Sequence, residues 1–141
     1  MAKRTLPLLA AAAAALGTPF IALATESVTC PAVFPMKAAR FGPTDDGWTA
    51  GPGQHDAALV GWGLTSGPPA QLADLQPSDD RKGLSIWKLA PPYPDGVWVE
   101  CVYADGALSL GKRLSATAGT CTAPDKRPRS GKPQPVTFTC R

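Results

Sequence analysis

The sequence predicts a mainly β protein: a compact antiparallel β domain of five to six short strands with one short helix and two disulfides. Three observations favour this fold class. Apolar residues alternate with a period of two in several short segments, which is typical of strands. Once Pro7, Pro19 and Gly17 are set aside, residues 25–141 still hold 14 Pro and 13 Gly, too many for long helices. The chain also has four cysteines, an even number that suggests paired thiols.

The first 24 residues have the layout of a secretory signal. Lys3 and Arg4 provide a positive start, residues 6–16 form an apolar run broken only by a proline, and Ala22 and Ala24 occupy the positions that a signal peptidase reads. We predict cleavage after Ala24. Residues 25–141 would then form a single exported domain, periplasmic or secreted.

An uncleaved membrane anchor is the alternative, because residues 5–25 carry no charge and approach the roughly 20 residues that span a bilayer. Gly17 and Pro19 interrupt this run where a signal loosens before cleavage. We therefore expect no stable membrane insertion once the signal is removed.

The charge of the exported domain excludes one class of function. Loss of Lys3 and Arg4 lowers the formal charge from +3 to +1. A general nucleic-acid binder normally carries a strong basic excess on one face, so no nucleic-acid partner is expected. Four of the remaining basic residues crowd the stretch 126–132, where they would form a local positive patch.

The four cysteines, Cys30, Cys101, Cys121 and Cys140, all lie in the exported part, where an oxidising compartment favours two disulfides. Three pairings are possible, and sequence alone does not choose among them. We favour Cys30–Cys101 and Cys121–Cys140, the second closing a short, proline-rich stretch. There is no Cys-x-x-Cys pair and only one His, so neither a metal site nor a cofactor is expected.

The first half of the exported domain contains two predicted strands. Residues 28–34 form a short edge strand, because Pro31 cannot donate to a sheet ladder. Residues 57–64 alternate, with Ala58, Val60, Trp62 and Leu64 on one face. Gly61 and Gly63 lie on the opposite face and leave it bare, so that a backbone, a ring or a ligand could approach closely there.

A short helix is predicted next. Residues 70–75 follow Pro69, which is tolerated at the first helical position, and Pro77 closes the segment after at most two turns. Residues 78–83 are expected to form a solvated turn, and residues 84–89 the next strand.

The clearest local signal is a β-hairpin. Residues 97–104 and 107–114 alternate on either side of Asp105-Gly106, a pair that suits a two-residue hairpin turn. In this register Trp98 faces Arg113, on the side opposite an apolar face that includes Cys101 and Tyr103. Two further strands are expected at residues 119–122 and 135–140.

The order of several residues resembles a family of small exported bacterial proteins of unknown function, typified by an enterobacterial hypothetical protein of the S-T-Y series. The resemblance covers nearly the whole exported part and implies a disulfide-containing domain with no assigned activity. It rests on Cys30-Pro31, Trp48, Gly67-Pro68-Pro69, Leu75, Pro77, Trp87, Trp98-x-x-Cys101-x-Tyr103, Cys121 and Cys140.

Catalytic candidates are few. His55 is the only imidazole, and the neighbouring Asp56 would point to the opposite face if both lay on a strand. The carboxylate pairs Asp45-Asp46 and Asp79-Asp80 lie in turn-like stretches, where aspartates commonly cap and solubilise. A small envelope hydrolase that uses His55 or an Asp pair is therefore the alternative interpretation rather than the favoured one.

Tryptophans provide the binding candidates. Trp62 and Trp87 are expected to fill the core, whereas Trp48 lies in a loop and Trp98, with Arg113, lies on the less apolar hairpin face. We predict a non-enzymatic binding or inhibitor module of the cell envelope that recognises a protein or an envelope polymer. One version, by fold-level analogy, is an inhibitor of a cell-wall hydrolase. A structural envelope component is a second alternative.

Overall fold

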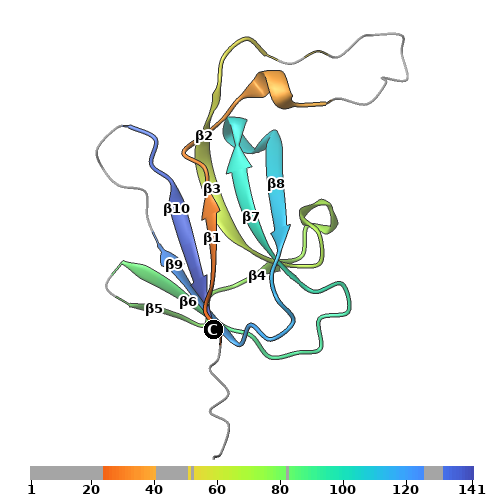
Figure 1. Cartoon of the computed structure of the whole chain (residues 1–141), viewed down its shortest axis with the longest axis vertical. Coiled ribbons are helices and arrows are strands. Elements are labelled where there is room, and N and C mark those ends of the chain that lie inside the picture. The colour runs from red at the N-terminus through yellow and green to blue at the C-terminus, as the bar shows by residue number, and fades with distance from the viewer. Residues whose placement is uncertain (1–23, 41–50, 52, 82, 126–131) are drawn as a thin grey trace, which may run out of the picture.

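The computed structural model describes residues 24–40, 51, 53–81, 83–125 and 132–141 (Figure 1). Within these residues the protein is built from antiparallel strands, and its helical segments are short 3-10 turns. The mainly β prediction is confirmed. The strands number ten rather than five or six, because several are only two or three residues long.

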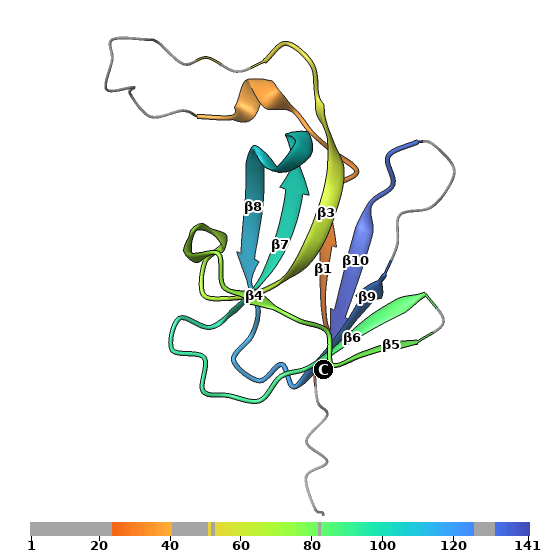
Figure 2. The same cartoon turned by 180° about the vertical axis from the view of Figure 1, so that it is seen from behind.

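The strands form two sheets. Two of the strands, at residues 74–75 and 79–81, lie in segments that were not predicted to be strands. Neighbouring strands in the first sheet are β1 (Glu26–Cys30), β10 (Val136–Cys140), β9 (Thr120–Pro124), β6 (Leu84–Lys88) and β5 (Asp79–Arg81). The second sheet has the order β2 (Val33–Phe34), β3 (Ala57–Ser66), β7 (Val97–Tyr103) and β8 (Leu108–Arg113), and β4 (Asp74–Leu75) also pairs with β3. Figure 2 shows the two sheets from behind.

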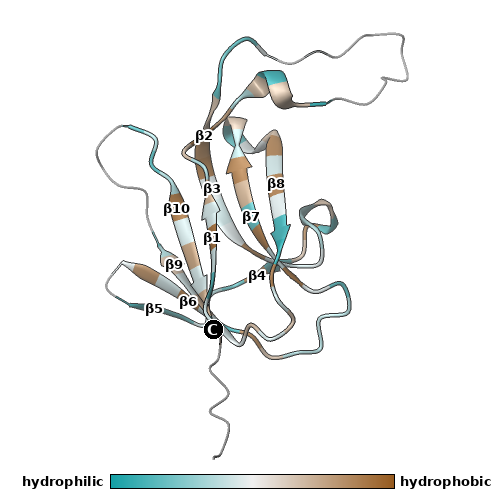
Figure 3. Ribbon diagram, in the orientation of Figure 1, coloured by the Kyte–Doolittle hydropathy of each residue, from teal (hydrophilic) through white to brown (hydrophobic). Residues whose placement is uncertain are grey.

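The core follows from the alternation of apolar side chains. Along β7, every second residue is buried, and the same pattern recurs in β10; Figure 3 shows brown residues alternating with paler ones on both strands. Tyr103 and Phe138 are the largest fully buried side chains. Phe138 packs on Trp87, with ring centroids 5.7 Å apart. Phe138 and Trp87 belong to the first sheet and Tyr103 to the second, and buried residues of both sheets form one hydrophobic cluster.

Both disulfides are present, and they have different roles in the fold. The bond Cys30–Cys101, with an S–S distance of 2.02 Å, joins β1 of the first sheet to β7 of the second. The bond Cys121–Cys140 joins neighbouring strands β9 and β10 at directly opposed positions. This is the pairing favoured above among the three possible ones. The first disulfide therefore links the sheets, and the second fixes a register within one sheet.

The β7–β8 hairpin has the predicted register. Trp98 lies opposite Arg113, and Tyr103 lies opposite Leu108. Asp105 and Gly106 both adopt positive φ, 54° and 96°, but so does Ala104, at 50°, and pairing stops at Tyr103 and Leu108. The connection is therefore a four-residue turn around Asp105-Gly106 rather than the predicted two-residue turn. The Asp-Gly signal thus located the turn correctly.

The segment predicted as a short helix differs in the structure. Residues 69–71 form a single 3-10 turn, and Leu72 ends it in the left-handed conformation, with φ of 51°. The chain then becomes extended as β4, in which Leu75 pairs with Leu64 of β3. A helix confined between Pro69 and Pro77 is too short to be stable alone, so strand pairing determines the local structure.

Two other segments also differ from the prediction. The predicted strand 28–34 divides at Pro31 and Ala32, where the chain passes from the first sheet to the second. The predicted turn 78–83 contains β5, which pairs with β6. β1 pairs with β10, which is far away in the sequence, and β5 is only three polar residues long, so local composition did not reveal these strands.

The predicted faces of β3 hold for Trp62 with Leu64 and for Gly61 with Gly63, but Ala57 and Leu59 lie on the core face, contrary to the prediction, because the strand contains a β-bulge. Leu59 pairs with Tyr103 and Gly61 with Val102, so Val60 is an extra residue between them. The bulge reverses the alternation: Leu59 and, beyond the bulge, Leu64 are both buried in the core. No helix of the described residues has the length and apolar character needed to cross a membrane.

Candidate partner-binding site

Strand β3 has a gap in its pairing along one edge. Its pairing with β2 ends at Ala58, and its pairing with β4 begins at Leu64. Between these points, residues 60–63 have no neighbouring strand on that side among the residues that the structure describes. Figure 2 shows β3 on the side of its sheet that faces the first sheet, so the gap opens between the two sheets.

A cavity of about 490 Å³ opens at this gap, and we call it the β3 groove. Its lining comes from β3, from β4 and the residues after it, and from β6, β7 and β9. The lining residues are Val60, Gly61, Trp62, Gly63, Leu64, Asp74, Leu75, Gln76, Pro77, Ser85, Trp87, Glu100, Val102, Pro124 and Asp125.

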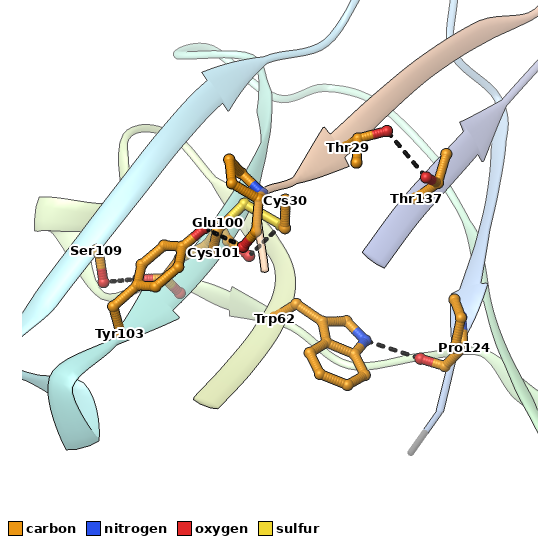
Figure 4. The surroundings of a disulfide bond; sticks show 10 residues. Thr29, Cys30, Trp62, Glu100, Cys101, Tyr103, Ser109, Pro124 and Thr137 are labelled. Atoms are coloured by element: carbon orange, nitrogen blue, oxygen red, sulfur yellow. Dashed lines mark hydrogen bonds between the residues drawn. A yellow bond between two sulfur atoms is a disulfide. The ribbon is translucent and has the colours of Figure 1, made fainter. Parts of the chain in front are cut away.

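Two tryptophans hold the walls of the groove in place. The Trp62 indole N–H donates to the carbonyl oxygen of Pro124 at 2.7 Å, so it connects β3 to β9 across the sheets (Figure 4). The Trp87 indole N–H donates to the carbonyl oxygen of Leu75 at 2.8 Å and connects β6 to β4. The prediction that both tryptophans fill the core is confirmed, because Trp87 is buried and Trp62 packs against the same cluster. Each ring also lines the groove.

Two glycines leave the outer side of β3 bare. A Cβ at Gly63 would meet no atom within 4 Å, and one at Gly61 would make ordinary contact with the Val102 Cβ at 3.5 Å. The groove therefore extends over the backbone of β3 as far as Glu100 and Val102. The sequence predicted that a backbone, a ring or a ligand could approach β3 closely at these glycines, and the open space agrees with that prediction.

The charged residues in the described lining of the groove all have one sign. Within the part of the chain that the structure describes, the lining contains Asp74, Glu100 and Asp125 and no lysine or arginine. The Glu100 carboxylate accepts a hydrogen bond from the Ser109 hydroxyl at 2.6 Å, which orients it on the outer face of β7. Carboxylates gathered in a concave surface raise the local negative potential.

The other binding candidates lie outside this groove. The Trp98 indole N–H donates to the carbonyl oxygen of Asp95 at 3.0 Å. Gly111 makes room for Trp98 and Pro69, whose atoms would lie 3.3 and 2.6 Å from a Cβ at that position. Arg113 is exposed and lines a separate cavity of about 480 Å³ beside Gly96. Thus Trp98 and Arg113 are neighbours, as the hairpin register predicts. Trp48 lies outside the described residues.

The structure does not bring the catalytic candidates together. His55 is exposed just before β3 and does not line the groove. Asp79 pairs with Arg81, whereas Asp80 accepts a hydrogen bond from the Ser85 hydroxyl at 2.7 Å. Asp45 and Asp46 lie outside the described residues. Within the described part of the chain, no cluster of three or more His, Cys, Asp or Glu side chains is arranged to hold a metal ion.

Sequence reasoning missed most of the groove. It singled out the bare face of Gly61 and Gly63, but it assigned Trp62 and Trp87 to the core alone. The acidic residues were also missed, because Asp74, Glu100 and Asp125 are far apart in the sequence. The pairing of distant strands brings these residues together, and no local motif marks them.

Comparison with known proteins assigns the chain to a family. The model for the family described as "Type VI secretion system Tli immunity protein" matches residues 53–141, a range that includes every residue of the β3 groove. No curated protein and no solved structure gives a significant match. A small bacterial protein family agrees with the resemblance noted above, although the S-T-Y type itself stays a prediction. Since the match covers more than half of the chain, the protein belongs to the type VI secretion system Tli immunity protein family.

Proposed function

We propose that this protein is exported and that, outside the cytoplasm, it binds and neutralises a toxin delivered by a type VI secretion system. The family match over residues 53–141 carries this proposal. An immunity protein fits a non-enzymatic binding module with a protein as its partner. The toxin thus replaces the unspecified protein or envelope polymer expected from the sequence.

The proposed location rests on two features. The first 24 residues have the layout of a secretory signal. All four cysteines of the chain are paired in two disulfides, and disulfides persist in oxidising compartments such as the periplasm. Together these features favour a protein that meets its toxin in the periplasm.

Binding without catalysis suits the arrangement of the side chains. His55 is exposed, and the Asp79 and Asp80 carboxylates each interact with a different partner, so they do not share one catalytic position. The β3 groove instead offers a concave surface with aromatic walls and acidic residues. These are features of a recognition surface.

A survival assay tests the proposal. Cells that lack this protein are mixed with the parent strain, whose type VI secretion system is active, and surviving recipients are counted. Expression of the full chain in the recipients should raise their survival at least tenfold. Expression of residues 25–141 without the signal should not. Equal survival with and without the full chain would contradict the proposed function. A secretion-inactive attacker provides the control.

A further inference from the structure

We infer that the β3 groove is the surface that binds the toxin, and that it takes an extended segment of the toxin bearing a lysine or arginine side chain. This inference rests on the proposed function and adds the site and the chemistry of the partner. Three independent features of the groove support it: an unpaired strand edge, open space above glycine, and negative charge.

The unpaired edge offers backbone hydrogen bonds. The Ser66 N–H donates to the carbonyl oxygen of Ala73 at 2.8 Å, on the side of β3 where β4 lies. Because alternate residues of a strand direct their N–H and C=O groups to the same edge, Leu64 and Trp62 direct theirs to this side too. β4 pairs with Leu64 but does not reach Trp62. An extended segment can add to an edge of this kind by main-chain pairing.

The length of the gap sets the size of the segment. Pairing with β2 ends at Ala58 and pairing with β4 begins at Leu64, which leaves residues 60–63 open. Four strand residues span about 13 Å, at about 3.3 Å per residue. The gap therefore suits a short extended stretch of a loop rather than a complete strand of a partner sheet.

The glycines allow this segment to lie close to β3. Gly63 has open space where a side chain would stand, and a Cβ at Gly61 would make only ordinary contact with Val102. The indole of Trp62, which is half-buried and held by Pro124, lines the same groove from the opposite face of β3. A flat, fixed ring of this kind also favours a cation above its face.

The charge selects the side chain of the partner. Asp74 is exposed and Glu100 and Asp125 are half-buried, and all three line the groove. Among the residues that the structure describes, no lysine or arginine lines the groove. A lysine or arginine from the toxin would provide complementary charge, which increases the association rate and selects against acidic partners.

The hairpin face is a weaker candidate for this contact. The Trp98 indole N–H is already bonded to the Asp95 carbonyl oxygen, and Gly111 brings Pro69 and Trp98 close together. Arg113 lines a different cavity. β8 is itself an edge strand of its sheet, but this face lacks the acidic lining of the groove.

Two matched pairs of variants test the inference in the survival assay, with each variant carried on the full chain. Gly63→Trp fills the groove, and Gly53→Trp places the same side chain on an exposed loop glycine that also has no atom within 4 Å of its Cβ position. Asp74→Lys reverses one exposed charge of the groove, and Asp56→Lys does the same outside it. Thermal unfolding and periplasmic abundance show whether each variant folds.

Gly63→Trp and Asp74→Lys should each lower survival at least tenfold relative to their controls, at equal abundance. Wild-type protection by both variants would overturn the groove as the binding site. Protection kept by Asp74→Lys alone would overturn the choice of a basic segment. If Gly63→Trp does not fold, the survival of recipients that carry Asp74→Lys decides whether the groove binds a basic segment, because this substitution adds no bulk to the core. Failure of the wild-type chain to protect would instead reject the proposed function, so the two failures are distinct.

Discussion

The two disulfides should contribute unequal amounts to stability, because they close loops of very different length. The sequence separation is 71 for Cys30–Cys101 and 19 for Cys121–Cys140. The loop-entropy relation gives about 4.4 kcal/mol for the first and about 3.2 kcal/mol for the second. Both pairs are buried, so replacement by alanine should cause similar losses of packing. The double variant Cys30→Ala/Cys101→Ala should therefore be less stable by about 1 kcal/mol than Cys121→Ala/Cys140→Ala.

Urea unfolding of residues 25–141 measures this difference. The free energy of unfolding is extrapolated to water for the wild type and both double variants, and the slopes are compared to show that the unfolded states are alike. The result that would refute the reasoning is an equal or larger loss in Cys121→Ala/Cys140→Ala. In that case the register fixed within the first sheet, rather than the link between the sheets, would dominate the stability.

Three further predictions concern single side chains. Trp62→Phe removes the bond to the Pro124 carbonyl oxygen and should lower the free energy of unfolding by about 1 kcal/mol, measured with urea. Burial raises the pKa of the Tyr103 hydroxyl, which donates to the Pro31 carbonyl oxygen at 2.8 Å; its contribution to stability should be complete below pH 10.0 and lost as the pH rises above it. Tyr103→Phe should remove that part of the decline above pH 10.0, and an unchanged decline would contradict the assignment. Gly111→Val places atoms where Pro69 packs and should lower the melting temperature, with a cost of about 1–3 kcal/mol, whereas an unchanged melting temperature would show that Pro69 moves aside freely.

Local signals in the sequence were sufficient for part of the fold. Asp105-Gly106 marked the position of the β7–β8 turn, and the alternation on either side predicted the register, although the turn itself has four residues. The even cysteine count suggested two disulfides, which the structure contains. Both features could be predicted because an Asp-Gly pair favours a turn and cysteines in an oxidising compartment favour disulfides.

Other features depend on contacts between distant segments, and the sequence did not reveal them. The bulge at Val60 exists because β3 pairs with β7, and it places Ala57 and Leu59 on the core face, contrary to the prediction. The segment that resembled a helix becomes β4, since pairing of Leu75 with Leu64 was not visible locally. The β3 groove combines these two effects, so only its glycines could be recognised beforehand.

Hydrogen–deuterium exchange of the purified protein, alone and with the proposed toxin bound, most directly tests whether the β3 groove is the binding surface. Toxin binding should slow amide exchange in residues 60–63 and in β4, because the added segment pairs with the open edge of β3. Slower exchange confined to β8 and the Trp98 face, with residues 60–63 unchanged, would contradict this mode of binding.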